Sequence, residues 1–312
     1  MLDPVIQRRL ENFSELPSIP AVISQVLKAL DNSDISASSL AAIIERDQTL
    51  TARVLRVANS PFYGFSRKIA TIDLAIVVMG LNTIKEIVLS LIIQRYFTKV
   101  GKNVFDVNLF WHYSVFCGSA SRYLARKLKY RLAGEAFVAG LMHDLGILVI
   151  IEVFRSSWIK IKELQKIKNM DLITAENAVL NCTHADIGAW VAEKWNLPDK
   201  LCAAIHNHHT SFKSLNGNKE FNSDSLDFSE EISQPLTAIV SMAEWFAEIM
   251  EFKKWDQSPN RPELYLSEEV FGNIYEDGLY DPNSAFEILK QEILSEYQKA
   301  SVFTEIPAKS LY

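Results

Sequence analysis

The sequence predicts an all-α fold made of two helical lobes. Apolar residues recur at intervals of three and four along most of the 312 residues, whereas the strict alternation typical of a half-buried strand is almost absent. Capping residues, prolines and glycines stand where these periodic segments begin and end. The length of the chain favours two domains over one, and its 48% of hydrophobic residues can fill two cores.

The first hundred residues predict five short amphipathic helices. Pro20 suits an early helical position, Gly80 closes the fourth helix and Asn82 caps the fifth. A polar break at residues 99–103 follows, so we expect the first lobe to span residues 1–100. The predicted helices cover residues 22–30, 40–44, 50–57, 72–79 and 84–92.

The rest of the chain predicts a second helical lobe and a C-terminal segment. Residues 211–234 are polar with little periodicity, which is typical of a surface loop, and residues 251–283 form a second polar stretch that contains prolines. We therefore expect a second lobe over residues 101–250 and a polar segment with a terminal helix over residues 251–312. The predicted helices cover residues 109–128, 136–153, 158–167 and 183–195, a segment opened by Pro235, and residues 286–297.

Charge and cysteine content narrow the class of protein. The net charge of −6 and the isoelectric point near 5.6 argue against a broad surface for nucleic acid or anionic lipid. The three cysteines have no metal-type spacing, and the N-terminal residues have no apolar leader core, which indicates reduced thiols in the cytoplasm. No apolar run reaches the roughly 18 residues of a membrane helix by this count, so no membrane segment is expected.

The pair His143-Asp144 is the first indication of function. Both residues lie in the apolar run at positions 140–150, where an unpaired charge is costly to bury, and a divalent cation would compensate it. Glu244 falls on the apolar stripe of its own predicted helix and needs a partner for the same reason. The alternative is a cluster held by mutual hydrogen bonds without an ion. His206 is interpreted as a surface residue.

Three motifs resemble a known family. These are Leu-Pro-Ser-Ile-Pro at residues 16–20, the segment from Ile43 to Gly64 that contains Val-Ala-Asn-Ser-Pro-Phe-Tyr-Gly, and Thr-Ile-Asp-Leu-Ala-Ile-Val-Val-Met-Gly-Leu at residues 71–81. They are similar to the HDOD family, the HD-related output domain of bacterial signalling proteins, and the resemblance extends from about residue 14 to about residue 210. It implies that the second lobe is a helical bundle of the HD phosphohydrolase type and that the protein has a regulatory role.

The resemblance also implies a set of metal ligands. In HD phosphohydrolases an early His, a His-Asp pair, further histidines and a late Asp bind the metal, and Glu244 stands here at the position of that Asp. Asn108 replaces the Glu that accompanies a third ion, so the site would hold one or two ions of iron, manganese or zinc. The implied ligands are His112, His143, Asp144, His184, His208, His209 and Glu244.

Two departures from the enzymes of this superfamily bear on catalysis. Ile147 stands where HD-GYP phosphodiesterases have a lysine, and no Gly-Tyr-Pro motif follows His209. The basic run at residues 122–131 offers Arg122 and Arg126 as candidates for phosphate binding. The alternative for this run is a solvated helix C-terminus, where cations favour the helix dipole.

Two functions therefore compete. The first is a regulatory scaffold that binds a protein of a signalling pathway, or a nucleotide, and turns over nothing. The second is a metal-dependent phosphohydrolase for a nucleotide or cyclic dinucleotide, in which water activated at the metal by His143 and Asp144 attacks the phosphate. The near-complete ligand set favours the second function, whereas the HDOD resemblance and Ile147 favour the first, which we prefer.

Overall fold

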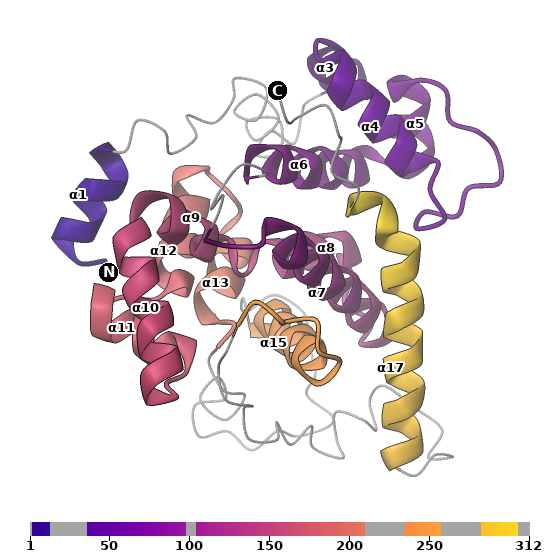
Figure 1. Ribbon diagram of the computed structural model, residues 1–312. Helices are drawn as coiled ribbons and strands as arrows, with labels where there is room; N and C mark the ends of the chain where they lie inside the picture. Colours follow the sequence, from indigo (N-terminus) through magenta and orange to yellow (C-terminus); the bar gives the residue numbers. More distant parts are fainter. Residues whose placement is uncertain (1, 13–35, 98–103, 210–233, 257–281, 305–312) are drawn as a thin grey trace.

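The described part of the molecule is built from helices, which confirms the predicted fold class. The computed structural model describes residues 2–12, 36–97, 104–209, 234–256 and 282–304, and none of these residues lies in a strand. Helices α7 and α8 occupy the middle of the molecule, α3 to α6 lie towards one end, and α9 to α13 lie on the other side (Figure 1). The predicted helix at 22–30 lies outside the described residues, as do almost all of the predicted loop at 211–234 and most of the polar stretch at 251–283.

The helices of the first lobe begin where the sequence supplies a side-chain cap. Ser36, Asp47 and Thr71 each accept a hydrogen bond from the backbone N–H three residues further on, which satisfies a donor that the helix itself leaves open. Gly80, at a φ of 85°, ends one helix and allows the next to start immediately. These helices are α3 (Ala37–Glu45), α4 (Gln48–Ala58), α5 (Ile72–Met79) and α6 (Leu81–Phe97).

The loop between α4 and α5, within the first lobe, packs against the second lobe. Its ends are tied by Asn59, whose Nδ2 donates to the carbonyl of Ile69 at 2.8 Å and whose Oδ1 accepts from the Ile69 N–H at 2.8 Å. The loop aromatics Phe62 and Tyr63 lie beneath the guanidinium of Arg122, whose Cζ is 4.0 Å and 4.9 Å from the two ring centroids. Cation–π attraction therefore holds the first lobe on helix α7 of the second.

The second lobe differs from the prediction at one important place. The predicted helix over residues 136–153 is two helices, because His143 and Asp144 form a turn between α8 and α9. The nine-residue helix α11 was not predicted. The helices of this lobe are α7 (Val107–Lys127), α8 (Ala133–Met142), α9 (Leu145–Val153), α10 (Arg155–Lys168), α11 (Leu172–Leu180), α12 (His184–Lys194), α13 (Asp199–Asn207) and α15 (Gln234–Ile249).

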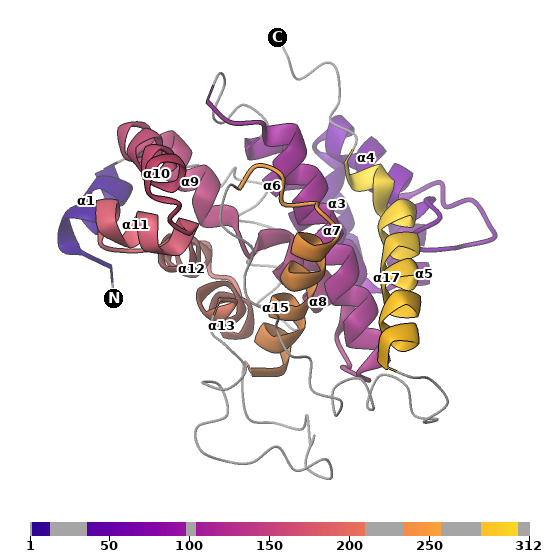
Figure 2. The same cartoon turned by 60° about the horizontal axis from the view of Figure 1, so that its bottom comes forward.

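Two terminal helices pack against the second lobe. Helix α1 (Pro4–Asn12), which was not predicted, places the guanidinium of Arg9 5.1 Å from the ring centroid of Phe154. Helix α17 (Pro282–Lys299) runs along α7, as Figures 1 and 2 show, and is followed by the short 3-10 helix η2 (Ala300–Phe303). The division of the chain at residues 100 and 250 stays a prediction.

Among the described residues, one stretch is long and apolar enough to cross a membrane. It covers residues 133–153, so the expectation that no run reaches this length was wrong. The stretch is 94% buried inside the fold, and the turn at residues 143–144 interrupts it. Its apolar character is therefore accounted for by its place in the core of the second lobe.

Candidate metal centre

Six of the seven predicted ligands meet in the interior of the second lobe. They come from four places in the chain: the turn between α8 and α9, the first residue of α12, the turn after α13, and α15. Five of the six are at most 1% exposed, and the side chain of His209 is 14% exposed. The residues of this cluster are His143, Asp144, His184, His208, His209 and Glu244.

Asp144 lies at the centre of the cluster because the helix breaks there. Its Oδ1 is 2.9 Å from His184 Nε2 and 3.3 Å from His208 Nε2, whereas its Oδ2 accepts a hydrogen bond of 3.0 Å from the hydroxyl of Tyr113. Burial would raise the pKa of the Asp144 carboxyl, but the neighbouring His143, Lys253 and His184 outweigh burial and hold it well below its usual range. Asp144 is therefore an anion at neutral pH.

Two glycines allow the N-terminal parts of α9 and α12 to pack closely against each other. A Cβ on Gly146 would lie 1.9 Å from the backbone oxygen of His184, and a Cβ on Gly188 would lie 3.2 Å from the Gly146 nitrogen. Neither glycine has a positive φ, so close packing rather than backbone conformation requires them. This contact brings His184 to Asp144.

His184 is oriented by a carboxylate on its outer side. Oε2 of Glu176, on α11, accepts hydrogen bonds from the His184 backbone N–H at 2.9 Å and from its Nδ1 at 2.8 Å. Nε2 therefore faces Asp144 and His209. Burial would lower the pKa of His184, but the Glu176 and Asp144 carboxylates together raise it to about 10. A carboxylate behind a ligand histidine is the usual support of metal sites in proteins.

The two histidines after α13 present their inner nitrogens to the same place. His208 Nδ1 is 2.6 Å from the carbonyl of Ile205, which can only accept, so Nδ1 carries the hydrogen and the lone pair is on Nε2. Burial is the main cause that lowers the pKa of His208 to about 4, which keeps the ring neutral. His209 Nε2 lies 2.8 Å from His184 Nε2, and its Nδ1 lies 3.5 Å from Glu244 Oε2.

On the side of the cluster where His143 and Glu244 lie, other protein groups bind the polar atoms. Tyr113 OH is 2.8 Å from His143 Nε2, and His143 Nδ1 is 2.8 Å from the carbonyl of Gly140. The ammonium of Lys253 lies 2.7 Å from Glu244 Oε1. Each of these polar groups therefore has a partner within the protein.

Asp144, His184, His208 and His209 offer four donor atoms whose spacing fits a divalent ion. With metal–ligand bonds of about 2.1 Å, neighbouring donor atoms lie about 3.0 Å apart at right angles and about 3.4 Å apart in a tetrahedron. Three separations among Asp144 Oδ1 and the Nε2 atoms of His184, His208 and His209 are 2.8, 2.9 and 3.3 Å. Each of the four residues offers a donor atom that lies within 4.8 Å of the donor atoms of the other three.

Two of these donors are also buried atoms that make no hydrogen bond of good geometry within the described residues. Among the described residues, neither Asp144 Oδ1 nor His208 Nε2 has a hydrogen-bond partner of good geometry. Buried polar atoms normally have a partner, because leaving one unsatisfied is costly. Imidazole and carboxylate donors suit iron, manganese and zinc alike. These residues could therefore hold an ion of any of the three.

Three predicted site residues lie outside this cluster. His112 is exposed and its Nδ1 is 2.7 Å from Tyr297 OH, because consecutive helical residues point about 100° apart and Tyr113 takes the inward direction. Arg122 and Arg126 lie about 14 Å and 20 Å further along α7 than Tyr113, at 1.5 Å per residue. Arg122 stacks on Phe62, and Arg126 Nη1 lies 3.6 Å from Glu296 Oε2.

Three residues of the site were missed in the sequence. Glu176 shares a buried helical face with Leu172 and Leu180, at spacings of four, so the rule that selected Glu244 would have found it. Tyr113 and Lys253 give no such signal. Lys253 follows a reversal of the chain at Glu251, whose φ is 57°, and only that turn brings its side chain back to the cluster.

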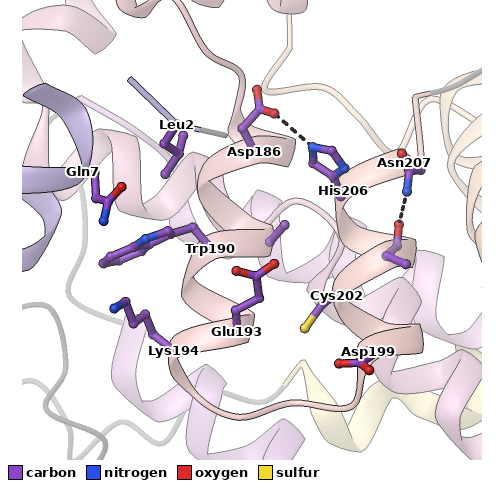
Figure 3. Close-up of a pocket in the computed structure, with 12 residues that line it drawn as sticks. Leu2, Gln7, Asp186, Trp190, Glu193, Lys194, Asp199, Cys202, His206 and Asn207 are labelled. Carbon is purple, nitrogen blue, oxygen red and sulfur yellow. Dashed lines mark hydrogen bonds and ion pairs between the residues drawn. The ribbon is translucent and has the colours of Figure 1, made fainter. Parts of the chain in front are cut away.

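A separate cavity of about 650 Å³ lies between α1, α12 and α13 (Figure 3). At its rim His206 Nε2 is 3.1 Å from Asp186 Oδ1, and this hydrogen bond raises the pKa of His206. The side chain of His206 is 49% exposed, in agreement with its interpretation as a surface residue. The residues lining this cavity include none of the six residues of the buried cluster.

The fold and the site together define a class of protein: a helical protein with a buried cluster of histidines and carboxylates in its second lobe. The chain belongs to the HDOD domain family, whose model matches residues 16–211. An uncharacterized protein of Treponema pallidum (strain Nichols) is 24% identical over 200 residues, which is 64% of this chain and 38% of that protein. The matched part thus spans well under half of this relative.

Solved structures share the fold. An HDOD domain protein of unknown function from Geobacter sulfurreducens matches with a TM-score of 0.72 and 20% identity, over 95% of this chain and 96% of that one. A protein of Shewanella amazonensis SB2B, provisionally named a phosphohydrolase, matches with a TM-score of 0.69 and 23% identity, over 97% and 98%. A protein of Marinobacter aquaeolei VT8, provisionally named for signal transduction, matches with a TM-score of 0.65 and 17% identity, over 96% and 65%.

Proposed function

We propose that this chain is a regulatory module of bacterial signal transduction whose second lobe holds a divalent metal ion without turning over a substrate. The ligands in this proposal are Asp144, His184, His208 and His209. The observation that carries it is the buried convergence of these four donors, two of which have no hydrogen-bond partner of good geometry among the described residues. When bound, the ion supplies a charge that three imidazoles and a carboxylate share, which ties α9, α12 and α13 together.

Burial supports a structural or regulatory ion over a catalytic one. The side chains of Asp144, His184 and Glu244 are fully buried, so a phosphate group would have to displace protein atoms to reach the ligand atoms. Ile147, one turn after the His-Asp pair, is also fully buried and offers no charge to a phosphate. The side chain of His209, at 14% exposed, provides the most open approach among the four proposed ligands.

The proposed partner is a protein of a signalling pathway. HDOD family membership and the structural likeness to the Marinobacter protein named for signal transduction support this choice. The net charge of −6 argues against nucleic acid as the main partner. In this proposal the metal fixes the arrangement of the second lobe, and the partner recognises that arrangement.

One observation favours a second function. Lys253 places a buried cation 3.9 Å from Asp144 Oδ2, and a lysine beside metal ligands can neutralise the charge that develops on a phosphate during hydrolysis. The Shewanella protein named a phosphohydrolase has the same fold. The alternative is therefore a metal-dependent phosphohydrolase that acts on a nucleotide or cyclic dinucleotide.

Elemental analysis and a turnover assay on purified protein separate the two functions. We expect a divalent ion in the wild type and its loss in His208→Ala, with no release of product from nucleotides or cyclic dinucleotides in either protein. His206→Ala, which changes the neighbouring surface histidine, serves as the matched control and should retain the ion. Hydrolysis that requires both added metal and His208 would establish the alternative, whereas a wild type that binds no metal would refute the proposed ion.

A further inference from the structure

The cluster has two unlike sides, divided by the carboxylate of Asp144. On the Oδ1 side lie the imidazole nitrogens of His184 and His208, and there neither Asp144 Oδ1 nor His208 Nε2 has a hydrogen-bond partner of good geometry among the described residues. On the Oδ2 side, Tyr113 binds Oδ2 and also lies 2.8 Å from His143 Nε2. One side is open to a cation, and the other is already satisfied by the protein.

The ammonium of Lys253 places a positive charge on the Oδ2 side of Asp144. Its Nζ lies 2.7 Å from Glu244 Oε1 and 3.9 Å from Asp144 Oδ2. Two further carboxylate oxygens lie close to the same ammonium, Asp256 Oδ2 at 3.8 Å and Glu248 Oε1 at 4.0 Å. The Lys253 side chain is only 5% exposed, so this charge is fixed in the interior rather than solvated.

Aromatic rings keep the ammonium in this position. Lys253 Nζ lies 5.6 Å from the ring centroid of Tyr113 and 5.4 Å from that of Trp255. Cation–π attraction to both rings adds to the ion pair with Glu244, and the reversal of the chain at Glu251 fixes the origin of the side chain. The ammonium is therefore held from several directions.

A second metal ion on this side would need the same oxygens. His143, His208 and Glu244 offer donor atoms within 4.8 Å of one another, which is a second group of metal-binding dimensions. Glu244 Oε1, however, already binds the ammonium, and His143 Nε2 lies against Tyr113 OH. A divalent ion placed here would also be repelled by the buried Lys253 charge.

From this asymmetry we infer that Lys253 takes the place of a second metal ion, so that the centre binds one divalent ion, on the Oδ1 side of Asp144. This inference rests on the proposed metal binding and adds its stoichiometry and the residue that sets it. The sequence alone left one or two ions open. A lysine tethered to the chain neutralises the second half of the cluster permanently, whatever the supply of metal.

Metal stoichiometry in Lys253→Met tests the inference. Methionine keeps an unbranched stem of similar length and removes the charge. Proteins are saturated with Mn²⁺ and desalted, the manganese per chain is measured by mass spectrometry, and binding is followed by calorimetry. We expect one ion in the wild type and two in Lys253→Met, with the paramagnetic resonance signal of a coupled manganese pair in the variant alone. Lys254→Met, at the exposed neighbouring lysine, should bind one ion.

The possible outcomes separate the inference from the proposed function. Two ions in the wild type, or one ion in a folded Lys253→Met, would overturn the role of Lys253 and leave metal binding intact. No ion in any of the proteins would overturn the proposed function itself. If Lys253→Met does not fold, Lys253→Arg provides the test, because it keeps the charge and should bind one ion, and two ions there would contradict the inference.

Discussion

Replacing Glu176 by Gln tests whether the cluster is organised as a metal site. Glu176 is fully buried, and its Oε2 accepts both hydrogen bonds that orient His184, at 2.8 and 2.9 Å. Gln has nearly the same shape and can still accept these bonds, but it removes the negative charge behind the imidazole. The perturbation therefore changes the electrostatics of His184 while it leaves the packing in place.

The structure gives the expected magnitude. A carboxylate that supports a ligand histidine contributes about 10- to 100-fold to metal affinity, which is about 1.4 to 2.7 kcal/mol. For the metal-free protein, hydrogen bonds to a charged group contribute about 1.5 to 3 kcal/mol each, against about 1 kcal/mol for neutral ones. We expect Glu176→Gln to weaken metal binding at least about tenfold and to lower the free energy of unfolding by about 1 to 3 kcal/mol.

The pH dependence of stability gives an independent check. Because the pKa of His184 is raised from 6.5 to about 10 in the folded protein, the stability it contributes is fully present below pH 6.5 and is lost as the pH rises through 10. A rise of this size corresponds to at most about 5 kcal/mol. Without metal, the wild type should lose stability over this window, and Glu176→Gln should lose less.

The assays are competition with a fluorescent chelator for metal affinity and urea denaturation in the presence of chelator, from pH 6 to 10. Glu163→Gln, at an exposed carboxylate on α10, is the control and should match the wild type in both. If Glu176→Gln bound metal with wild-type affinity and unfolded at the wild-type urea concentration, the role assigned to Glu176 would be refuted.

Three further predictions concern other parts of the fold. Gly146→Ala should lower the free energy of unfolding by at least about 3 kcal/mol and abolish metal binding, because the new Cβ would lie 1.9 Å from the His184 backbone oxygen. Urea denaturation measures this loss, and a loss below about 1 kcal/mol would contradict the close contact. Burial is the main cause that raises the pKa of Glu86 to about 7, so its ionisation destabilises the fold as the pH rises from 4.5 through 7. Glu86→Gln should therefore be more stable than the wild type at pH 8, by at most about 3 kcal/mol, and equal to it at pH 4, and thermal melting that shows no gain at pH 8 would speak against this. Arg122→Lys should lower the free energy of unfolding by about 1 to 2 kcal/mol in thermal melting, because the planar contact of the guanidinium with Phe62 is lost, and should leave the metal content unchanged. A drop in metal content would instead indicate that this arginine contributes to the site.

The sequence by itself determined the fold class and singled out most residues of the buried cluster that forms the candidate metal site. Helical periodicity and the caps at Ser36, Asp47 and Thr71 are local properties, so they predict helices without knowledge of the fold. A buried charge must be compensated wherever the chain takes it, and this requirement is enough to single out Asp144 and Glu244 from their apolar neighbours in the sequence. The same argument singled out His143 beside Asp144, and the resemblance to the HDOD family added the other histidines.

Tertiary structure alone decided which groups complete the site and which do not. His112 and Tyr113 are neighbours in the chain, and only the rotation of α7 against α17 and the cluster shows that the tyrosine faces inward. Lys253 comes from a polar segment with no periodic signal, more than a hundred residues after Asp144, and the turn at Glu251 brings the two together. Distances between residues far apart in sequence depend on how helices cross, and no local pattern encodes that crossing.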